Sequence, residues 1–169
     1  FEMILFKNLA QELLTNCRKK KLKLLTAESC TGGLLSANIT GIAGSSDVFL
    51  HGFICYSNES KKQYLNVSNR IINSFGAVSY ETVKEMLSGL SIQSKSKALT
   101  IAISGVAGPQ QSESKPVGLV FIGAKLSDNN LELIKKMNFG NIARDQIQQK
   151  SVHEALKISL NLIGASKKF

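Results

Sequence analysis

The chain has 169 residues, of which 43% are hydrophobic and 20% charged, which fits one soluble domain with a substantial core. No apolar run of about 18 residues or more occurs, so we expect no transmembrane helix and no membrane association. The net charge of +9 would suit a nucleic-acid binder. The one dense basic cluster, residues 18–23, lies where a helix should end and has no interleaved aromatic residues. We therefore favour a basic, solvated surface without a nucleic-acid partner.

The cysteines and the first residues bear on compartment and boundaries. Three cysteines form no CxxC pair and are odd in number, which favours free thiols in a reducing, cytoplasmic compartment. Phe1 and Glu2 precede Met3, which we expect to be the natural start. The segment that follows carries charged residues where a signal peptide has an apolar centre. Residues 1–169 are thus expected to form one domain.

The first half of the chain alternates helical and strand patterns. Apolar residues at helical spacing predict an amphipathic helix over residues 4–19. The apolar run 22–27 predicts a strand, and a turn over 28–33 leads into a second helix from Leu34, closing at Gly41 or Gly44. The remaining features are a buried strand and then a polar turn with a short helix, at residues 48–56 and 57–64.

The second half ends in a hairpin and a closing helix. Ser79 is a good N-cap for a helix whose apolar residues are Val83, Met86, Leu87 and Leu90. Further strands are expected at 98–103, 117–124 and 131–137, with a polar loop at 107–116 and a last helix from Ile147 to Ile163. This order predicts an α/β fold, a three-layer α/β/α sandwich with a mixed, mostly parallel sheet.

Ligands of open α/β sheets gather at the carboxyl ends of strands. The sharpest such segment begins with Ser29, directly after a strand, and continues through Thr31, Gly32 and Gly33 into a helix. Glycines allow close approach to the backbone, and free N–H groups at a helix start can hold a phosphate or an oxyanion. Ser29 is a candidate nucleophile. The alternative, that Ser29 or Thr31 merely caps the helix, is favoured by the pattern alone.

A serine nucleophile needs a base, and the two histidines, His51 and His153, lie in no recognisable motif. A lysine can act as the base when burial lowers its pKa. Lys61 follows a strand end that could lie beside the first one, and Tyr56 could relay a proton or orient that lysine. A solvated turn is the alternative for Lys61, and the spacing alone favours it.

Metal chemistry finds little support in this sequence. Two distant histidines, no HExxH motif and no paired cysteines leave no set of ligands with recognisable spacing, so we expect neither a metal nor a cofactor. Cys30, beside the predicted helix start, is interpreted as a small buried residue of the turn and not as a nucleophile.

Seven short motifs follow one another along the chain. They are Thr26-Ala27-Glu28-Ser29-Cys30-Thr31-Gly32-Gly33, Gly41-Ile42-Ala43-Gly44-Ser45-Ser46, Gly52-Phe53, Tyr56-Ser57-Asn58-Glu59 with Lys61, Gly76-Ala77-Val78-Ser79, Ser104-Gly105-Val106-Ala107-Gly108-Pro109 and Lys115-Pro116-Val117-Gly118. In this order they resemble the motifs of the CinA C-terminal (competence-damage-inducible protein) family. The resemblance covers roughly residues 5–163, nearly the whole chain, and its motifs are specific.

The resemblance implies a nicotinamide-nucleotide amidase in its stand-alone form. Such an enzyme converts nicotinamide mononucleotide and water to nicotinate mononucleotide and ammonia, in pyridine nucleotide recycling. The family's nucleophile maps onto Ser29, its partners onto Tyr56 and Lys61, and a phosphate-binding arginine onto Arg144. The residues expected to contact substrate beside Arg144 are Thr31, Gly32, Gly33, Gly44, Ser45, Asn58, Ser104 and Gly105.

Two segments depart from the family's pattern. The usually glycine-rich loop reads Gln110-Gln111-Ser112-Glu113-Ser114, and the approach to the last helix is stretched to Gly140-Asn141-Ile142-Ala143-Arg144, with Gln148 in place of a second arginine. A binding or regulatory module with little turnover is therefore the alternative function. A nucleic-acid binder, recognisable by steep salt dependence, rests on the charge alone. The sequence does not determine the oligomeric state, and a homo-oligomer is compatible with it.

Overall fold

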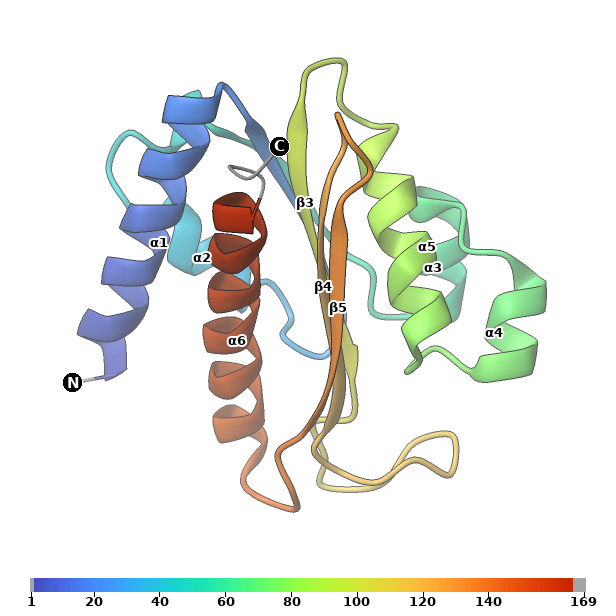
Figure 1. Cartoon of the computed structure of the whole chain (residues 1–169). Coiled ribbons are helices and arrows are strands. Elements are labelled where there is room, and N and C mark those ends of the chain that lie inside the picture. The colour runs from blue at the N-terminus through green and yellow to red at the C-terminus, as the bar shows by residue number, and fades with distance from the viewer. Residues whose placement is uncertain (1, 166–169) are drawn as a thin grey trace.

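The computed structural model describes residues 2–165, with side chains over residues 6–164 (Figure 1). Phe1, which precedes the expected start at Met3, lies outside this range. The helices and strands in chain order are α1 Glu2–Lys20, β1 Lys23–Glu28, α2 Leu34–Thr40, the 3₁₀ helix η1 Ser45–Asp47, β2 Phe49–Ile54, α3 Asn58–Leu65, α4 Asn69–Phe75, α5 Tyr80–Ser91, β3 Ala98–Gly105, β4 Leu119–Leu126, β5 Glu132–Asn138 and α6 Arg144–Ala165.

The strands of the described chain form one sheet in the order β2-β1-β3-β4-β5. β1 pairs in parallel with β2 and β3, whereas β4 pairs antiparallel with β3 and β5. Only β4 is reversed, so the other strands of this sheet share one direction. The predicted α/β sandwich with a mixed sheet is confirmed, and its parallel pairing is confined to β2, β1 and β3.

Helices cover both faces of the sheet and bury two cores. α1, α2 and α6 lie on one face, and α3, α4 and α5 lie on the other (Figure 1). Both neighbours of β1 are strands and both its faces are covered, which is why every residue of this strand from Leu24 to Glu28 is buried. The α5 side chains expected from helical spacing are all buried: Val83, Met86, Leu87 and Leu90.

The helix ends follow the local sequence. The Ser79 hydroxyl accepts a hydrogen bond from the backbone N–H of Thr82 at 3.1 Å, so the predicted N-cap of α5 is confirmed. The last turn of α1 is basic, as the cluster at residues 18–23 predicted. Arg18 in that turn forms an ion pair with Asp47, with Nε and Oδ2 2.6 Å apart.

Several elements differ from the sequence prediction. The short helices η1 and α4 were not expected, and α4 buries none of its residues and so carries no apolar periodicity. β4 begins at Leu119 and not at residue 117, because Gly118 adopts a φ of 88° and lies against Gly140. A Cβ on Gly118 would stand 2.2 Å from the Gly140 carbonyl oxygen, so this close approach requires glycine.

A helix that crosses a bilayer needs about 20 mostly apolar residues. Within the described residues, no helix combines that length with enough apolar character.

Candidate functional site

A cleft of about 310 Å³ opens where β1 and β3 end. Its walls come from the connections that follow β1, β2 and β3, from the turn before α5, and from the start of α6. The loop of residues 107–116 and the start of α6 lie together at the lower end of the molecule (Figure 1). The lining residues are Ser29, Cys30, Tyr56, Asn58, Lys61, Ala77, Val78, Ser104, Gly105, Val106, Ala107, Gly108, Gln110, Ser112, Glu113 and Arg144.

Ser29 and Lys61 meet in this cleft. Ser29 immediately follows β1, and Lys61 lies in the first turns of α3, the helix that follows β2. Because β1 and β2 are parallel neighbours, their carboxyl ends lie side by side and bring the two residues together. Lys61 Nζ lies 3.0 Å from Ser29 Oγ, a hydrogen-bonding distance. The sequence patterns could only propose this pairing, and the fold produces it.

Lys61 is buried and fully engaged, in contrast to the solvated turn that its spacing alone favoured. Only 1% of its surface is exposed. Its Nζ also donates to the carbonyl oxygens of Cys55 at 2.8 Å and Tyr56 at 3.3 Å. A neutral amine has two N–H groups for these two carbonyls and a lone pair for the Ser29 hydroxyl. Both protonation states therefore satisfy every partner.

Burial is the main influence on the Lys61 amine. It lowers the Lys61 pKa from the ordinary value of 10.5, because the charged form is poorly solvated. Nearby Cys55, Cys30 and Glu113 raise that pKa by smaller amounts. A lysine whose neutral form is accessible can take a proton from the serine hydroxyl that it contacts.

Glu28, the last residue of β1, is a buried carboxylate that sequence reasoning missed. Its Oε1 accepts from the Thr31 hydroxyl and the Leu35 N–H, both at 2.8 Å. Its Oε2 accepts from the N–H of Ser36 at 3.0 Å and from the hydroxyl of the same serine at 2.6 Å. The signal was available, because an acidic residue at the end of an apolar strand must find partners when buried.

The start of α2 is consequently not an open anion site. Its free N–H groups were expected to hold a phosphate or an oxyanion, but those of Leu35 and Ser36 are bonded to Glu28. The N-cap position is Gly33, with a φ of 100° and no side-chain cap. The structure therefore gives the glycines a backbone role, turning the chain from β1 into α2 around the Glu28 carboxylate.

Tyr56 and Arg144 form a second contact across the cleft. Arg144 donates to the Tyr56 hydroxyl at 2.9 Å and to the Gly108 carbonyl at 2.5 Å. The phenol of Tyr56 therefore points to Arg144, the arginine expected to bind phosphate. The contact of Tyr56 with the Lys61 amine is made by its backbone carbonyl and not by its hydroxyl.

The remaining expected contact residues fall into two groups. Asn58, Ser104 and Gly105 line the cleft, with the Ser104 hydroxyl donating to the Ala77 carbonyl at 2.7 Å. The other group, Thr31, Gly32, Gly33, Gly44 and Ser45, is absent from the cleft lining.

Gly44 and Ser45 precede β2 and lie at the opposite end of the sheet. The Gly44 carbonyl accepts from Arg18 at the end of α1, and Ser45 belongs to η1. A glycine motif in the sequence does not reveal which end of a sheet it will occupy, and this motif shapes the turn before β2.

Two further side chains of the cleft region have structural partners. Cys30 lines the cleft, and burial raises the pKa of its thiol to about 12, which makes it a poor nucleophile. Gln148 of α6, where the family usually has an arginine, donates to the Cys30 carbonyl at 2.9 Å and so supports the turn after Ser29. Among the described residues, no group of three His, Cys, Asp or Glu side chains could hold a metal.

Known proteins that resemble this chain in sequence and in fold are members of the CinA family. The sequence profile of the CinA C-terminal domain matches residues 6–163, nearly the whole chain. The chain belongs to the CinA C-terminal domain family. A CinA-like protein of Prochlorococcus marinus subsp. pastoris is 43% identical over 165 residues, which are 95% of this chain and 37% of that protein. A putative competence-damage inducible protein of Caldicellulosiruptor bescii is 46% identical over 112 residues, 66% of this chain and 27% of that protein.

Solved structures of CinA relatives share the fold along their whole length. The competence/damage inducible protein CihA of Agrobacterium tumefaciens superposes with a TM-score of 0.89 and 38% identity, covering 94% of this chain and 95% of that one. The competence damage-inducible protein A of Klebsiella pneumoniae gives 0.87 and 28%, covering 97% and 98%. The curated CinA relatives are longer, and the chain spans 37% or less of the two described above.

Proposed function

We propose that this CinA-family chain is a nicotinamide-nucleotide amidase, which converts nicotinamide mononucleotide and water to nicotinate mononucleotide and ammonia. The observation that carries the proposal is the 3.0 Å contact between Lys61 Nζ and Ser29 Oγ, made by a lysine that is almost fully buried. A serine hydroxyl beside an accessible neutral amine is the arrangement of Ser-Lys hydrolases, which cleave amide bonds through an acyl-enzyme.

In the first half of the reaction, Ser29 Oγ attacks the carboxamide carbon while its proton passes to Lys61 Nζ. The resulting tetrahedral intermediate collapses as Lys61 returns the proton to the amide nitrogen. The C–N bond breaks, ammonia leaves, and the acyl group remains on Ser29 as an ester. The carbonyls of Cys55 and Tyr56 hold the amine in place during both transfers.

In the second half, water attacks the ester carbon and gives its proton to Lys61. The C–O bond to Ser29 then breaks, and Lys61 returns the proton to the departing Oγ. The products are nicotinate mononucleotide and free Ser29, so one water is consumed and one ammonia released in each cycle.

The cleft suits a nucleotide of this size and charge. Its volume of about 310 Å³ lies at the lower end of the range typical of small-molecule sites, about 300–1,000 Å³. Arg144 presents a guanidinium on the cleft wall, where it would pair with the 5′-phosphate through a charge-assisted contact. The proposal thus assigns Ser29 and Lys61 to chemistry and Arg144 to binding.

The decisive experiment is product analysis with the purified chain and nicotinamide mononucleotide. We expect stoichiometric ammonia and nicotinate mononucleotide, and loss of at least about 10³-fold in turnover for Ser29→Ala. Ser74→Ala is the matched control, because Ser74 is exposed and does not line the cleft. Near-normal turnover by a folded Ser29→Ala protein would contradict the assignment. Tight nucleotide binding without ammonia release would instead indicate the binding or regulatory module.

A further inference from the structure

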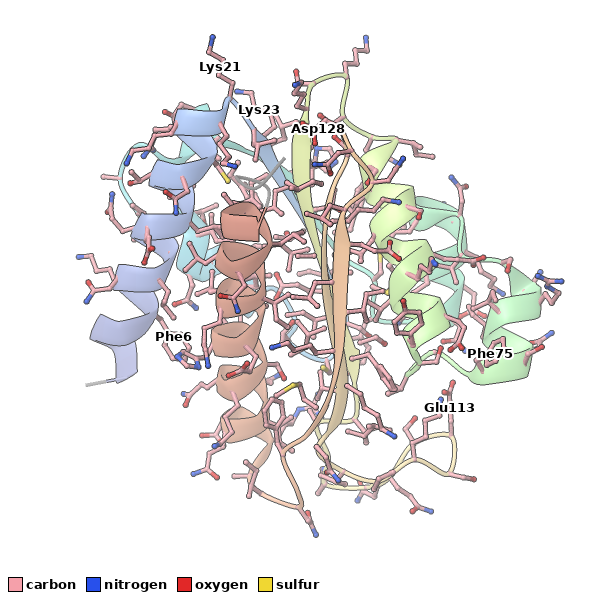
Figure 2. The ribbon with its side chains drawn as sticks, in the orientation of Figure 1. Phe6, Lys21, Lys23, Phe75, Glu113 and Asp128 are labelled. Carbon is pink, nitrogen blue, oxygen red and sulfur yellow. The ribbon has the colours of Figure 1, made fainter. Side chains whose placement is uncertain are left out.

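The loop that departs from the family pattern contributes a carboxylate to the cleft. Glu113 stands where the family usually has a glycine-rich segment, and it lines the same cleft as Ser29 and Lys61. Figure 2 shows its side chain rising from the loop towards the part of the molecule that carries Phe75. Among the described residues that line the cleft, Glu113 is the one acidic side chain, and Lys61 and Arg144 are the two cationic ones.

Hydrogen bonds within the loop, and between the loop and the segment that joins α4 to α5, hold the Glu113 carboxylate in place. The backbones of Ser112 and Lys115 bond to each other at 3.3 and 2.8 Å, which closes a tight turn. Glu113 Oε2 accepts from the Ala77 N–H at 2.9 Å, and Lys115 donates to the carbonyls of Phe75 and Val78. The loop is thus fastened to the segment between α4 and α5.

The turn puts Glu113 in an unfavourable conformation. Glu113 and Ser114 have φ values of 51° and 59°, in the left-handed region that glycine, asparagine and aspartate prefer. A glutamate is therefore a poor choice for the turn itself. Its side-chain bond to Ala77 uses Oε2, and no hydrogen bond of the described residues engages Oε1. The cleft-lining carboxylate of Glu113 therefore has one oxygen without a described hydrogen bond.

We infer that Glu113 is a specificity-determining residue that recognises the positive charge of the pyridinium ring, and so selects nucleotides with an oxidised, cationic base. The inference rests on the proposed function and deepens it. The carboxamide is attached directly to that ring, so a carboxamide placed at Ser29 brings the cationic ring beside the cleft wall. Arg144 would meet the anionic end of the substrate, and Glu113 would meet the cationic one.

The same carboxylate acts on the base. Glu113 raises the pKa of Lys61, while burial lowers it to a greater extent. Burial also raises the pKa of the Cys30 and Cys55 thiols, so both are uncharged near neutral pH. Removing the charge of Glu113 should therefore shift the Lys61 pKa downwards, a readout that a purely mechanical role in the loop would not give.

The test uses Glu113→Gln, whose amide oxygen can still accept from Ala77 while the charge is lost. The two substrates are nicotinamide mononucleotide and its reduced 1,4-dihydro form, which has the same phosphate and carboxamide but an uncharged ring. Each variant is compared with wild type on the same substrate, so the different reactivities of the two carboxamides cancel. Glu59→Gln is the control, because Glu59 is exposed and lies outside the cleft lining.

We expect Glu113→Gln to raise KM about fivefold for the cationic substrate and to leave KM for the reduced form nearly unchanged, as for a partly solvated charge pair. The acidic limb of its kcat/KM profile should move to lower pH. Equal effects on both substrates, or none, would overturn the inference while ammonia release still supports the amidase. If wild type releases no ammonia, the proposed function fails, and calorimetric binding of the two nucleotides to wild type and Glu113→Gln decides the inference by the same comparison.

Discussion

The guanidinium of Arg144, at the start of α6, donates to the phenol oxygen of Tyr56, which lies just beyond the end of β2. This bond links the segment after β2 to the start of α6 across the cleft. Arg144 itself is exposed and lines the cleft.

Arg144→Ala should therefore weaken substrate binding more than chemistry. Loss of a charge-assisted contact is worth about 1.5–3 kcal/mol, so KM should rise about 10- to 100-fold while kcat changes little. Lys150→Ala is the control, because Lys150 is an exposed cation of the same helix outside the cleft lining. Steady-state kinetics measure both constants. A fall in kcat at unchanged KM would place Arg144 in the chemical step.

Lys61→Arg should abolish the chemical step, because arginine keeps the positive charge but cannot deprotonate in a protein. We expect a loss of about 10²–10⁴-fold in kcat, and a similar loss in Lys61→Met, which replaces the amine by an apolar chain. Lys62→Arg should be nearly silent, since Lys62 is half-buried and only forms an ion pair with Glu59 at 3.8 Å. Equal, modest effects at both positions would mean that another group is the base.

The pH dependence should follow Lys61. Its neutral form is the base, and burial holds its pKa below 10.5, so kcat/KM should rise with pH and level off below that value. The unfolded chain binds this proton more tightly than the folded one. Stability should therefore increase with pH between the folded pKa and 10.5, and fall as Lys61 is protonated. Denaturant titrations across this window check the slope, which Lys61→Met should lack.

Glu28→Gln should destabilise the fold and misplace Ser29. The amide has one acceptor oxygen for four donors, and its own N–H₂ group faces donors. We expect a loss of about 2–3 kcal/mol in the free energy of unfolding and a Tm lower by about 5–10 °C. Glu12→Gln, on an exposed position of α1, should leave Tm unchanged. Calorimetry that finds both variants alike would show that the Glu28 carboxylate is not required at this turn.

Much of the fold was predictable because its signals are local. Helical spacing and apolar runs located α1, α5, α6 and the strands, while α4 escaped because it buries nothing. That Ser29 and Lys61 lie together could be proposed from the sequence, because the carboxyl ends of neighbouring parallel strands lie side by side. The local patterns favoured a helix cap for Ser29 and a solvated turn for Lys61. Their burial and their 3.0 Å contact depend on the pairing of β1 with β2, which no local pattern encodes.

The substrate contacts were harder to predict from sequence. Gly44 and Ser45 belong to a motif of the family, yet the chain carries them to the end of the sheet away from the cleft. Gln148 went unnoticed as a support, because its role is a hydrogen bond to the Cys30 carbonyl, which lies far away in the sequence. Such a bond depends on three-dimensional placement and leaves no spacing in the sequence. Glu28 was overlooked although its partners lie within the next eight residues of the chain.

The strand order has a consequence for synthesis on the ribosome. β1 lies between β2 and β3, but β2 follows it closely in the chain whereas β3 begins only at Ala98. A nascent chain can therefore pair β1 with β2 early and bring Ser29 to Lys61, while the other edge of β1 stays unpaired until residues 98–105 have emerged. That unpaired edge is open to pairing with foreign strands in the interval.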